Sequence, residues 1–381
     1  MQRSSERILT THTGSLPRPP ALAELLVARE TGQSYDEAGL EEAIRRGVEE
    51  TVRQQCETGL DVINDGEMSK FFYATYIKER LTGFEGESLT RPIADARDFP
   101  EFAARGTTSS RSIRRTPACT GPIAYRGEAE LKRDLANIAS ALEGREPAEA
   151  FMSAASPGVV ACFIQNRHYP DDEAYVYAIA EAMKAEYAAI HEAGLILQLD
   201  CPDLAMGRHF QFADEGLDAF LRNAELNVEA LNHALADIPA DRLRMHLCWG
   251  NYEGPHHWDV PLAEIVAIVL RARPDAISFE GANPRHGHEW RVFEEVKLPA
   301  GKMLIPGVID STTNYIEHPD YVAERIVRYA GLVGRENVIA GVDCGFATSA
   351  VSTKVDARIA WAKLGSLVEG ARRASRQLWA D

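Results

Sequence analysis

The feature that most constrains the fold is a repeated alternation of short apolar runs with amphipathic helical patterns. It is clearest from residue 173 onward, where each apolar run ends in polar residues and is followed by a helical pattern. Buried strands separated by helices are typical of βα units, which build a parallel sheet. The strands predicted in this half are Ile196–Asp200, Leu243–Cys248, Ala276–Glu280, Leu304–Asp310 and Val338–Cys344.

The first half of the chain adds three strands of the same kind, predicted at Ile8–Thr13, Asp61–Gly66 and Ala150–Ser156. With the five later strands they make eight, the number that closes a (β/α)8 barrel. We therefore expect an α/β fold, a (β/α)8 TIM barrel. We find no internal repeat and no low-complexity linker, so we expect residues 1–381 to form one domain.

One interval does not follow the βα rhythm. Residues from about 71 to 148, between the second and third predicted strands, are rich in Arg, Thr and Gly and fit no βα unit. We expect a large insertion there, with an additional hairpin at Ser112–Tyr125.

Composition narrows the class of partner. The formal net charge of −16 disfavours nucleic acid and anionic membranes. No apolar run approaches the roughly 20 residues of a membrane span, and the polar start at Met1–Glu6 lacks the apolar region of a secretory signal. The six cysteines are widely spaced and are best interpreted as reduced thiols. These features predict a cytoplasmic protein that acts on small molecules.

Polar residues end the predicted strands. The carboxyl ends of barrel strands open on one face, where active sites are built, so these side chains should converge. They are His12, Glu67, Asp200, His246, Cys248, Glu280, Asp310 and Cys344.

Four of these residues are suited to holding a metal ion. His246 and Cys248 are two apart on one strand, so their side chains point to the same side. Glu280 and Cys344 end two other strands. A His-x-Cys pair alone is more often a packing feature, but together with an acid and a second cysteine it predicts a zinc site.

The strand-end motifs resemble the catalytic half of cobalamin-independent methionine synthase, in the same order over nearly the whole chain. The resemblance implies that His246, Cys248, Glu280 and Cys344 bind Zn²⁺. The matching motifs are Thr11-His12-Thr13-Gly14-Ser15-Leu16-Pro17, Asp65-Gly66-Glu67, Gln198-Leu199-Asp200-Cys201-Pro202, His246-Leu247-Cys248, Phe279-Glu280, Pro306-Gly307-Val308-Ile309-Asp310 and Asp343-Cys344-Gly345.

The resemblance also implies that Gly14, Ser15, Glu67 and Asp200 bind the amino acid homocysteine, and we group His12 with them as a substrate-binding residue. The residue chemistry agrees. Two acids can hold an ammonium group, and backbone amides at Gly14 and Ser15 can face an anion. The alternative for each acid is a helix cap or an ion pair with arginine.

The chain departs from that family at the donor end. The family places a histidine after the residue that matches Asp310, and it is thought to protonate the folate leaving group. Here the sequence continues Ser311-Thr312-Thr313-Asn314, and Cys201 replaces an acid after Asp200. The chain corresponds to the C-terminal barrel of that enzyme alone.

We therefore expect a zinc-dependent S-alkyltransferase, with methyl transfer to a thiol such as homocysteine as the leading hypothesis. Asp310 and Thr312 are the candidate catalytic residues at the donor end. One alternative opens an epoxide, as in the epoxyalkane:coenzyme M transferases, which this chain also resembles. The others are a metal-free decarboxylase, on the barrel of uroporphyrinogen decarboxylase, and a non-catalytic zinc protein.

The expected partners are a small-molecule thiol and an alkyl donor. The sequence leaves the identity of both open. It also leaves open whether the protein is a homo-oligomer, and what His256, His257, His286 and His288 do.

Overall fold

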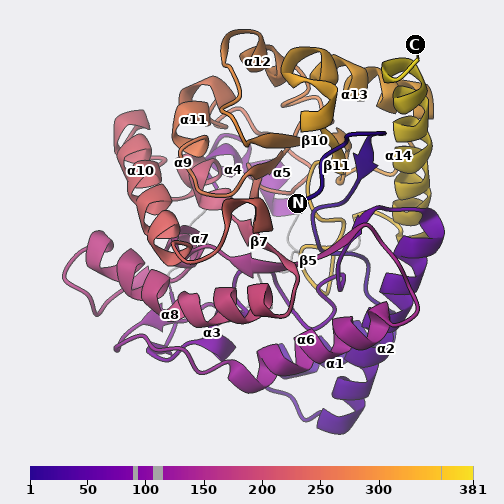
Figure 1. The fold of residues 1–381 in the computed structure, drawn as a ribbon. Coiled ribbons are helices and arrows are strands. Elements are labelled where there is room, and N and C mark those ends of the chain that lie inside the picture. The colour runs from indigo at the N-terminus through magenta and orange to yellow at the C-terminus, as the bar shows by residue number, and fades with distance from the viewer. Residues whose placement is uncertain (89–92, 106–114, 353, 381) are drawn as a thin grey trace.

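The computed structural model describes residues 1–88, 93–105, 115–352 and 354–380. Its central sheet has eight strands in the order β1-β11-β10-β9-β8-β7-β5-β2, and every neighbouring pair is parallel. A parallel bridge between Thr11 and Val62 connects the two outer strands and closes the sheet. Helices surround these strands (Figure 1). The predicted (β/α)8 barrel is confirmed.

Each barrel strand overlaps one predicted strand. The strands are β1 Leu9–Thr10, β2 Val62–Ile63, β5 Glu149–Ala155, β7 Ile196–Asp200, β8 Leu243–Leu247, β9 Ala276–Phe279, β10 Met303–Ile309 and β11 Ile339–Val342. Cys248, Glu280 and Asp310 each follow the last residue of a strand directly. The strand ends therefore lie where the polar residues begin.

The outer layer consists of helices whose buried faces pack on the strands. The longer ones are α1 Pro20–Thr31, α2 Glu37–Thr58, α6 Glu128–Leu142, α8 Asp172–Glu192, α10 Leu217–Ala234, α11 Leu262–Val269, α13 Pro319–Val333 and α14 Ala357–Leu378. Shorter ones are α3 Ile77–Arg80, α4 Ala94–Asp98, α5 Pro100–Arg105, α7 Pro157–Phe163, α9 Gly207–Phe210 and α12 Val292–Glu295. Four 3₁₀ turns lie at Pro202–Leu204, Ala240–Arg242, Glu289–Arg291 and Arg335–Asn337.

Helix α13 shows how the sequence sets a helix of this layer. Pro319 occupies its first turn, where the missing N–H is not needed, and His318 accepts a hydrogen bond from the Asp320 N–H. Val322 and Ile326 recur at helical spacing and are fully buried. Among the described helices, none has the length and apolar character that crossing a membrane requires.

The interval predicted as an insertion contains α3, α4, α5 and α6 and two short strands, β3 Phe84–Glu85 and β4 Ala118–Cys119. Strand β4 pairs antiparallel with β3 and parallel with β6, Gln165–Asn166, in a second small sheet. Helix α6 packs on α2 and α8, as part of the outer helix layer. The single-domain assignment for residues 1–381 stays a prediction.

The hairpin predicted within Ser112–Tyr125 lies partly outside the described residues, because residues 112–114 are not described. In the described part, Ala118–Cys119 pairs with Phe84–Glu85 and with Gln165–Asn166 instead of with another part of that range.

A buried arginine fills the barrel interior below the strand ends. Arg244, on β8, is 0% exposed, and its guanidinium lies 4.1 Å from the centre of the Phe151 ring. It donates hydrogen bonds to Thr11 Oγ1 (3.0 Å) and to the His12 carbonyl oxygen (2.9 Å). These bonds hold the end of β1 in place, beneath the face where the polar residues collect.

Candidate functional site

The carboxyl ends of β8 and β11 bring a histidine and two cysteines together. One ligand atom each from His246, Cys248 and Cys344 lies within 4.8 Å of the other two. The two cysteine sulfur atoms are 3.6 Å apart. His246 Nδ1 is 3.3 Å from Ser278 Oγ, while His246 Nε2 is buried and has no hydrogen-bond partner. Three of the four predicted metal ligands thus converge as the sequence suggested.

The chemistry of these three side chains fits zinc. Burial, aided by Arg244, lowers the pKa of His246 to about 3, so the imidazole is neutral and its unpartnered nitrogen is a free donor atom. The neighbouring Cys344 and burial raise the pKa of Cys248, which keeps the Cys248 thiol protonated without a cation. Zinc prefers thiolate and imidazole ligands and displaces such thiol protons.

Glu280, the predicted fourth ligand, lies elsewhere in its strand-end loop. Its Oε1 accepts a hydrogen bond from the Trp249 N–H (2.9 Å), and Oε2 accepts from Asn283 Nδ2 (2.7 Å) and from the Arg285 guanidinium (2.6 Å). It is not part of the cluster formed by the other three ligands. The Glu280 carboxylate forms an ion pair with Arg285. The role of Glu280 as a metal ligand therefore stays a prediction.

Asp343 shapes the loop that carries Glu280, a role that the sequence did not indicate. Its Oδ1 accepts from the N–H groups of Gly281 (2.8 Å) and Ala282 (2.7 Å), and Oδ2 accepts from Asn283 N (2.7 Å) and Nδ2 (2.8 Å). Burial raises the pKa of Asp343 to about 7, helped by Glu280. Its only sequence signal is its place beside Cys344.

The two predicted ammonium-binding acids lie in the wall of one cavity. Glu67 Oε1 accepts from Ser153 Oγ (2.6 Å), and Glu67 Oε2 is buried without a partner. Asp200 Oδ1 accepts from Gln198 Nε2 (2.9 Å). Burial, and then the negative charge of Glu67, raise the pKa of Asp200 well above its usual range. A carboxylate pair of this kind is stabilised by an incoming cation.

Gly14 lies against Glu67, and Ser15 lines the same cavity. A Cβ atom on Gly14 would come within 2.8 Å of Glu67 Oε1, so only glycine allows the β1 loop to approach this closely. Ser15 lines the cavity, and its carbonyl oxygen accepts a hydrogen bond from the Phe346 N–H (3.0 Å). The β1 loop is thereby joined to the loop that carries Cys344.

Five predicted site residues do not line the cavity: His12, Gly14, Glu280, Asp310 and Thr312. His12 is buried in the barrel, where Nε2 lies 2.7 Å from Gln55 Oε1. Asp310 Oδ1 accepts from the N–H and hydroxyl of Thr312 (2.8 Å each), and Oδ2 accepts from Thr313 (2.8 Å). The hydrogen-bonding groups of Asp310 and Thr312 thus bond to each other within a local turn. Their predicted roles in binding and catalysis are not supported by a contact with the cavity.

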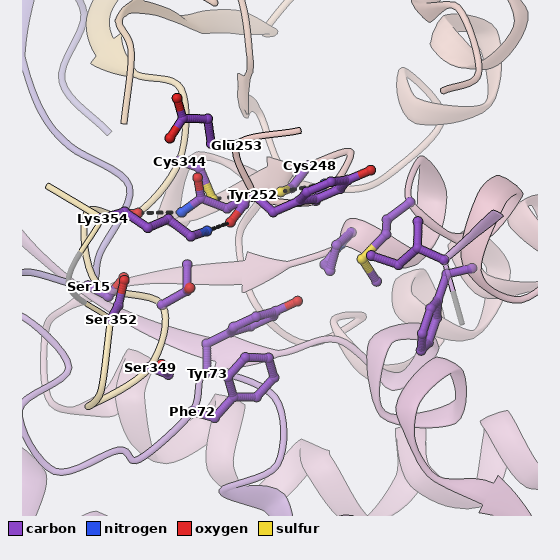
Figure 2. A pocket seen from close by; sticks show the side chains of 18 of the residues that line it. Ser15, Phe72, Tyr73, Cys248, Tyr252, Glu253, Cys344, Ser349, Ser352 and Lys354 are labelled. Atoms are coloured by element: carbon purple, nitrogen blue, oxygen red, sulfur yellow. Dashed lines mark hydrogen bonds between the residues drawn. The ribbon is translucent and has the colours of Figure 1, made fainter. Parts of the chain in front are cut away.

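The cavity measures about 660 Å³ and holds the three-residue cluster on one side. Figure 2 shows Cys248 and Cys344 on the same side as Lys354, with Phe72 and Tyr73 across from them. Lys354 donates a hydrogen bond to the Asn251 carbonyl oxygen. The sequence did not single out Lys354, because it lies in a loop beyond the last strand.

The histidines left open by the sequence have distinct places. His256 and His286 both contact Asp259, through contacts of 3.0 Å. His257 lies 3.1 Å from Asp95 and 2.7 Å from Asp98 of the insertion, and His288 is exposed.

Comparison with known proteins points to the family that the strand-end motifs resemble. A family model described as cobalamin-independent synthase, catalytic domain, matches residues 8–97 and 155–371. An uncharacterised protein of Bacillus subtilis is 25% identical over 377 residues, covering 94% of this chain and 92% of its own length. A methionine synthase of Saccharolobus islandicus is 25% identical over 371 residues, covering 97% and 95%. The structure of a B12-independent methionine synthase from a Shewanella species, in complex with selenomethionine, covers 98% of this chain and 100% of its own. Its TM-score is 0.74 at 19% identity, so it shares the fold.

Proposed function

The chain belongs to the cobalamin-independent synthase catalytic-domain family, and on that premise we propose that it is a zinc-dependent methyltransferase that alkylates a thiol such as homocysteine. The observation that carries the proposal is the convergence of His246, Cys248 and Cys344 on a cavity whose wall also holds two buried carboxylates.

In this proposal His246, Cys248 and Cys344 would hold the zinc ion, with Glu280 as the expected fourth ligand. When bound, zinc supplies a Lewis acid that keeps an acceptor thiol in its nucleophilic thiolate form at neutral pH. A carboxylate that already has an alternative partner is suited to exchange, because Arg285 stabilises it when it is not on the metal.

The acceptor is oriented by the acids in the cavity wall. An amino-acid ammonium placed between Glu67 and Asp200 would fill the vacant hydrogen-bonding position of Glu67 Oε2 and relieve the repulsion between the two carboxylates. Ser15, which lines the same cavity as Glu67, would contact the carboxylate group of the amino-acid acceptor. Holding the acceptor at both ends converts the alkyl transfer into a step between preoriented groups.

A second candidate is the opening of an epoxide by the same thiol. The mostly apolar wall formed by Phe72, Phe163, Met206 and Phe210 favours a small electrophile without charge. The decarboxylase alternative requires arginines for substrate carboxylates. Of the described residues that line the cavity, none is an arginine.

The test combines binding and turnover. Purified protein is loaded with zinc, and X-ray absorption at the zinc edge is recorded with and without homocysteine. A third sulfur neighbour on adding homocysteine, together with methionine formed from an activated methyl donor, supports the proposal. Unchanged sulfur coordination and no alkylated thiol with any donor would contradict it.

A further inference from the structure

Three histidines surround one buried aspartate, and one of the three, His209, lines the cavity. Asp259, in the loop after β8, lies with Oδ1 3.0 Å from His209 Nδ1 and with Oδ2 3.0 Å from both His256 Nδ1 and His286 Nε2. Arg285 is 3.5 Å from the same Oδ2. Burial alone would raise the pKa of Asp259, but hydrogen bonds from these histidines lower it well below its usual range. Asp259 is therefore an ionised carboxylate.

Two of the three histidines have both ring nitrogens engaged. His256 Nε2 lies 3.1 Å from the Tyr252 carbonyl oxygen, and His286 Nδ1 lies 2.9 Å from Glu289. Contacts with Asp259 and Glu289 outweigh burial and raise the pKa of His286 to about 9. Neither ring lines the cavity. These two histidines hold Asp259 and have no nitrogen left for a substrate.

His209 differs from both. It lines the cavity, is 0% exposed, and its Nε2 has no hydrogen-bond partner. Its Nδ1 is at hydrogen-bond distance from Asp259, although the ring is not aligned for the bond. An unpaired buried ring nitrogen destabilises the protein, and a ligand atom beside it would supply the missing hydrogen bond.

The chain places this ring next to the cysteine cluster. The Met206 N–H donates to the Cys248 carbonyl oxygen (3.2 Å), and the His209 N–H donates to the Met206 carbonyl oxygen (3.2 Å). A Cβ atom on Gly250 would lie 3.8 Å from His209 Nε2, and Gly250 also lines the cavity. His209 thus lies beside the residues that directly follow Cys248.

We propose that His209, oriented by Asp259, is the acid that protonates the leaving group of the alkyl donor, which rests on the proposed function. The acceptor sulfur contributes the electron pair of the new S–C bond. The C–X bond of the donor breaks, its electron pair goes to X, and X takes the proton from His209 Nε2. An amine nitrogen or an epoxide oxygen leaves in this way as a neutral N–H or O–H. The histidine missing after Asp310 is thereby replaced from another loop.

A metal ion is the other occupant to consider, because ligand atoms of Asp95, His209 and Asp259 lie within 4.8 Å of one another. Arg285 and the protonated His286 already neutralise Asp259. The two charges of a divalent ion would meet more repulsion from Arg285 and His286 than the single charge of a proton, so the arrangement favours a proton.

The test uses two donors that differ in their need for an acid. Zinc-loaded wild type and His209→Asn are assayed with homocysteine and either an epoxide, whose oxygen must be protonated, or a methylsulfonium, which leaves as a neutral thioether. We expect His209→Asn to lower epoxide turnover by roughly 10² to 10⁴-fold, the contribution typical of general acids. Methylsulfonium turnover should change less than about threefold, within the ordinary scatter of conservative variants.

A control variant and a solvent isotope effect complete the test. His233→Asn, at an exposed histidine outside the cavity lining, is the matched control. On wild type alone, turnover with the epoxide should slow in D₂O and turnover with the sulfonium should not. Equal losses with both donors, no loss with either, or a metal equivalent lost from His209→Asn would overturn the proposal. No turnover of wild type with either donor would instead reject the proposed function.

Discussion

Glu67 is the clearest example of a residue held in a costly conformation at the site. Among the described residues it alone combines a side chain larger than hydrogen with a positive φ, 57°. Such a backbone costs roughly 1 to 3 kcal/mol and persists where the surroundings impose it. Its N–H donates to Asp65 Oδ1 (3.0 Å), and Arg18 donates to its carbonyl oxygen (2.7 Å). These bonds keep its carboxylate in the cavity wall.

The first prediction concerns recognition of the acceptor. Glu67→Gln and Asp200→Asn should each weaken binding of homocysteine by roughly 1.5 to 3 kcal/mol, because a hydrogen bond to a charged group is lost. Calorimetric titration of the zinc-loaded protein measures this. A thiol of similar size without an amino group serves as control and should bind the variants as it binds wild type. Equal weakening of both thiols would show that the acids only support the loops.

The second prediction concerns pH and stability. The pKa of Asp200 is raised in the folded protein, so the folded state retains a proton that the unfolded chain has lost. Its contribution therefore favours folding at acidic pH and becomes unfavourable as pH rises from the ordinary carboxyl range towards the folded pKa. Asp200→Asn should stabilise the ligand-free protein at neutral pH by about 1 to 3 kcal/mol. Urea unfolding should show that this gain disappears near pH 4, and a gain independent of pH would contradict the assignment.

The third prediction concerns the metal. Cys248→Ser and Cys344→Ser should each remove most bound zinc and the activity, because a hydroxyl is a poor substitute for a thiolate. The barrel should remain folded by circular dichroism, since its packing does not depend on the ion. Cys56→Ser, on the outer helix α2, is the matched control and should keep the metal. Full zinc content in both site variants would refute the ligand set.

At the level of secondary-structure elements, the sequence predicted the parts that depend on local pattern. Each apolar run became a strand because it is buried on both faces, and polar residues ended it where the strand leaves the barrel. The partners of those polar residues were not predictable. The Glu280 contact with Arg285 and the local turn of Asp310 depend on loop conformation, which hydrophobic periodicity does not encode.

The fourth prediction tests the loop held by Asp343. Asp343→Asn replaces one acceptor oxygen with an NH₂ group that faces N–H donors of the Glu280 loop, and each unsatisfied buried donor costs about 1 to 3 kcal/mol. Urea unfolding should therefore show a loss of that order, with weaker zinc retention because Glu280 is no longer held. Asp237→Asn, at an exposed position, should leave both unchanged. Wild-type stability in Asp343→Asn would contradict this role.

At the scale of the whole molecule, the insertion and the barrel share the cavity. Ala96 on α4 and Phe102 on α5 line it together with strand-end residues such as Cys248. The sequence indicated an insertion but not its position over the site, because that position depends on contacts far apart along the chain. One of them links Trp258 N–H to Asp95 Oδ1 (2.9 Å). The insertion therefore forms part of the cavity wall and limits the cavity volume.

The fifth prediction concerns the part of the cavity wall that the insertion forms. Ala96→Trp should raise KM for a bulky donor such as methyltetrahydrofolate by roughly tenfold or more, equivalent to about 1.4 kcal/mol, by occupying cavity volume. KM for a small epoxide should change little, and zinc content should not change. Ala104→Trp, on the same insertion but outside the cavity lining, is the control. An equal rise for both donors would mean that Ala96 acts through the fold rather than through donor size.

The pairing of β1 with β11 joins the first barrel strand to the last, with Leu9 opposite Ile339. Cys344 lies just beyond β11, so its sulfur reaches His246 and Cys248 only when β11 is part of the barrel. Contacts between residues so distant in sequence form late, because loop-closure entropy must be overcome first. If the proposed site holds a metal, tight metal uptake should therefore follow the docking of β11. A cobalt-substituted thiolate absorption band would serve as an optical reporter of the moment at which the barrel closes.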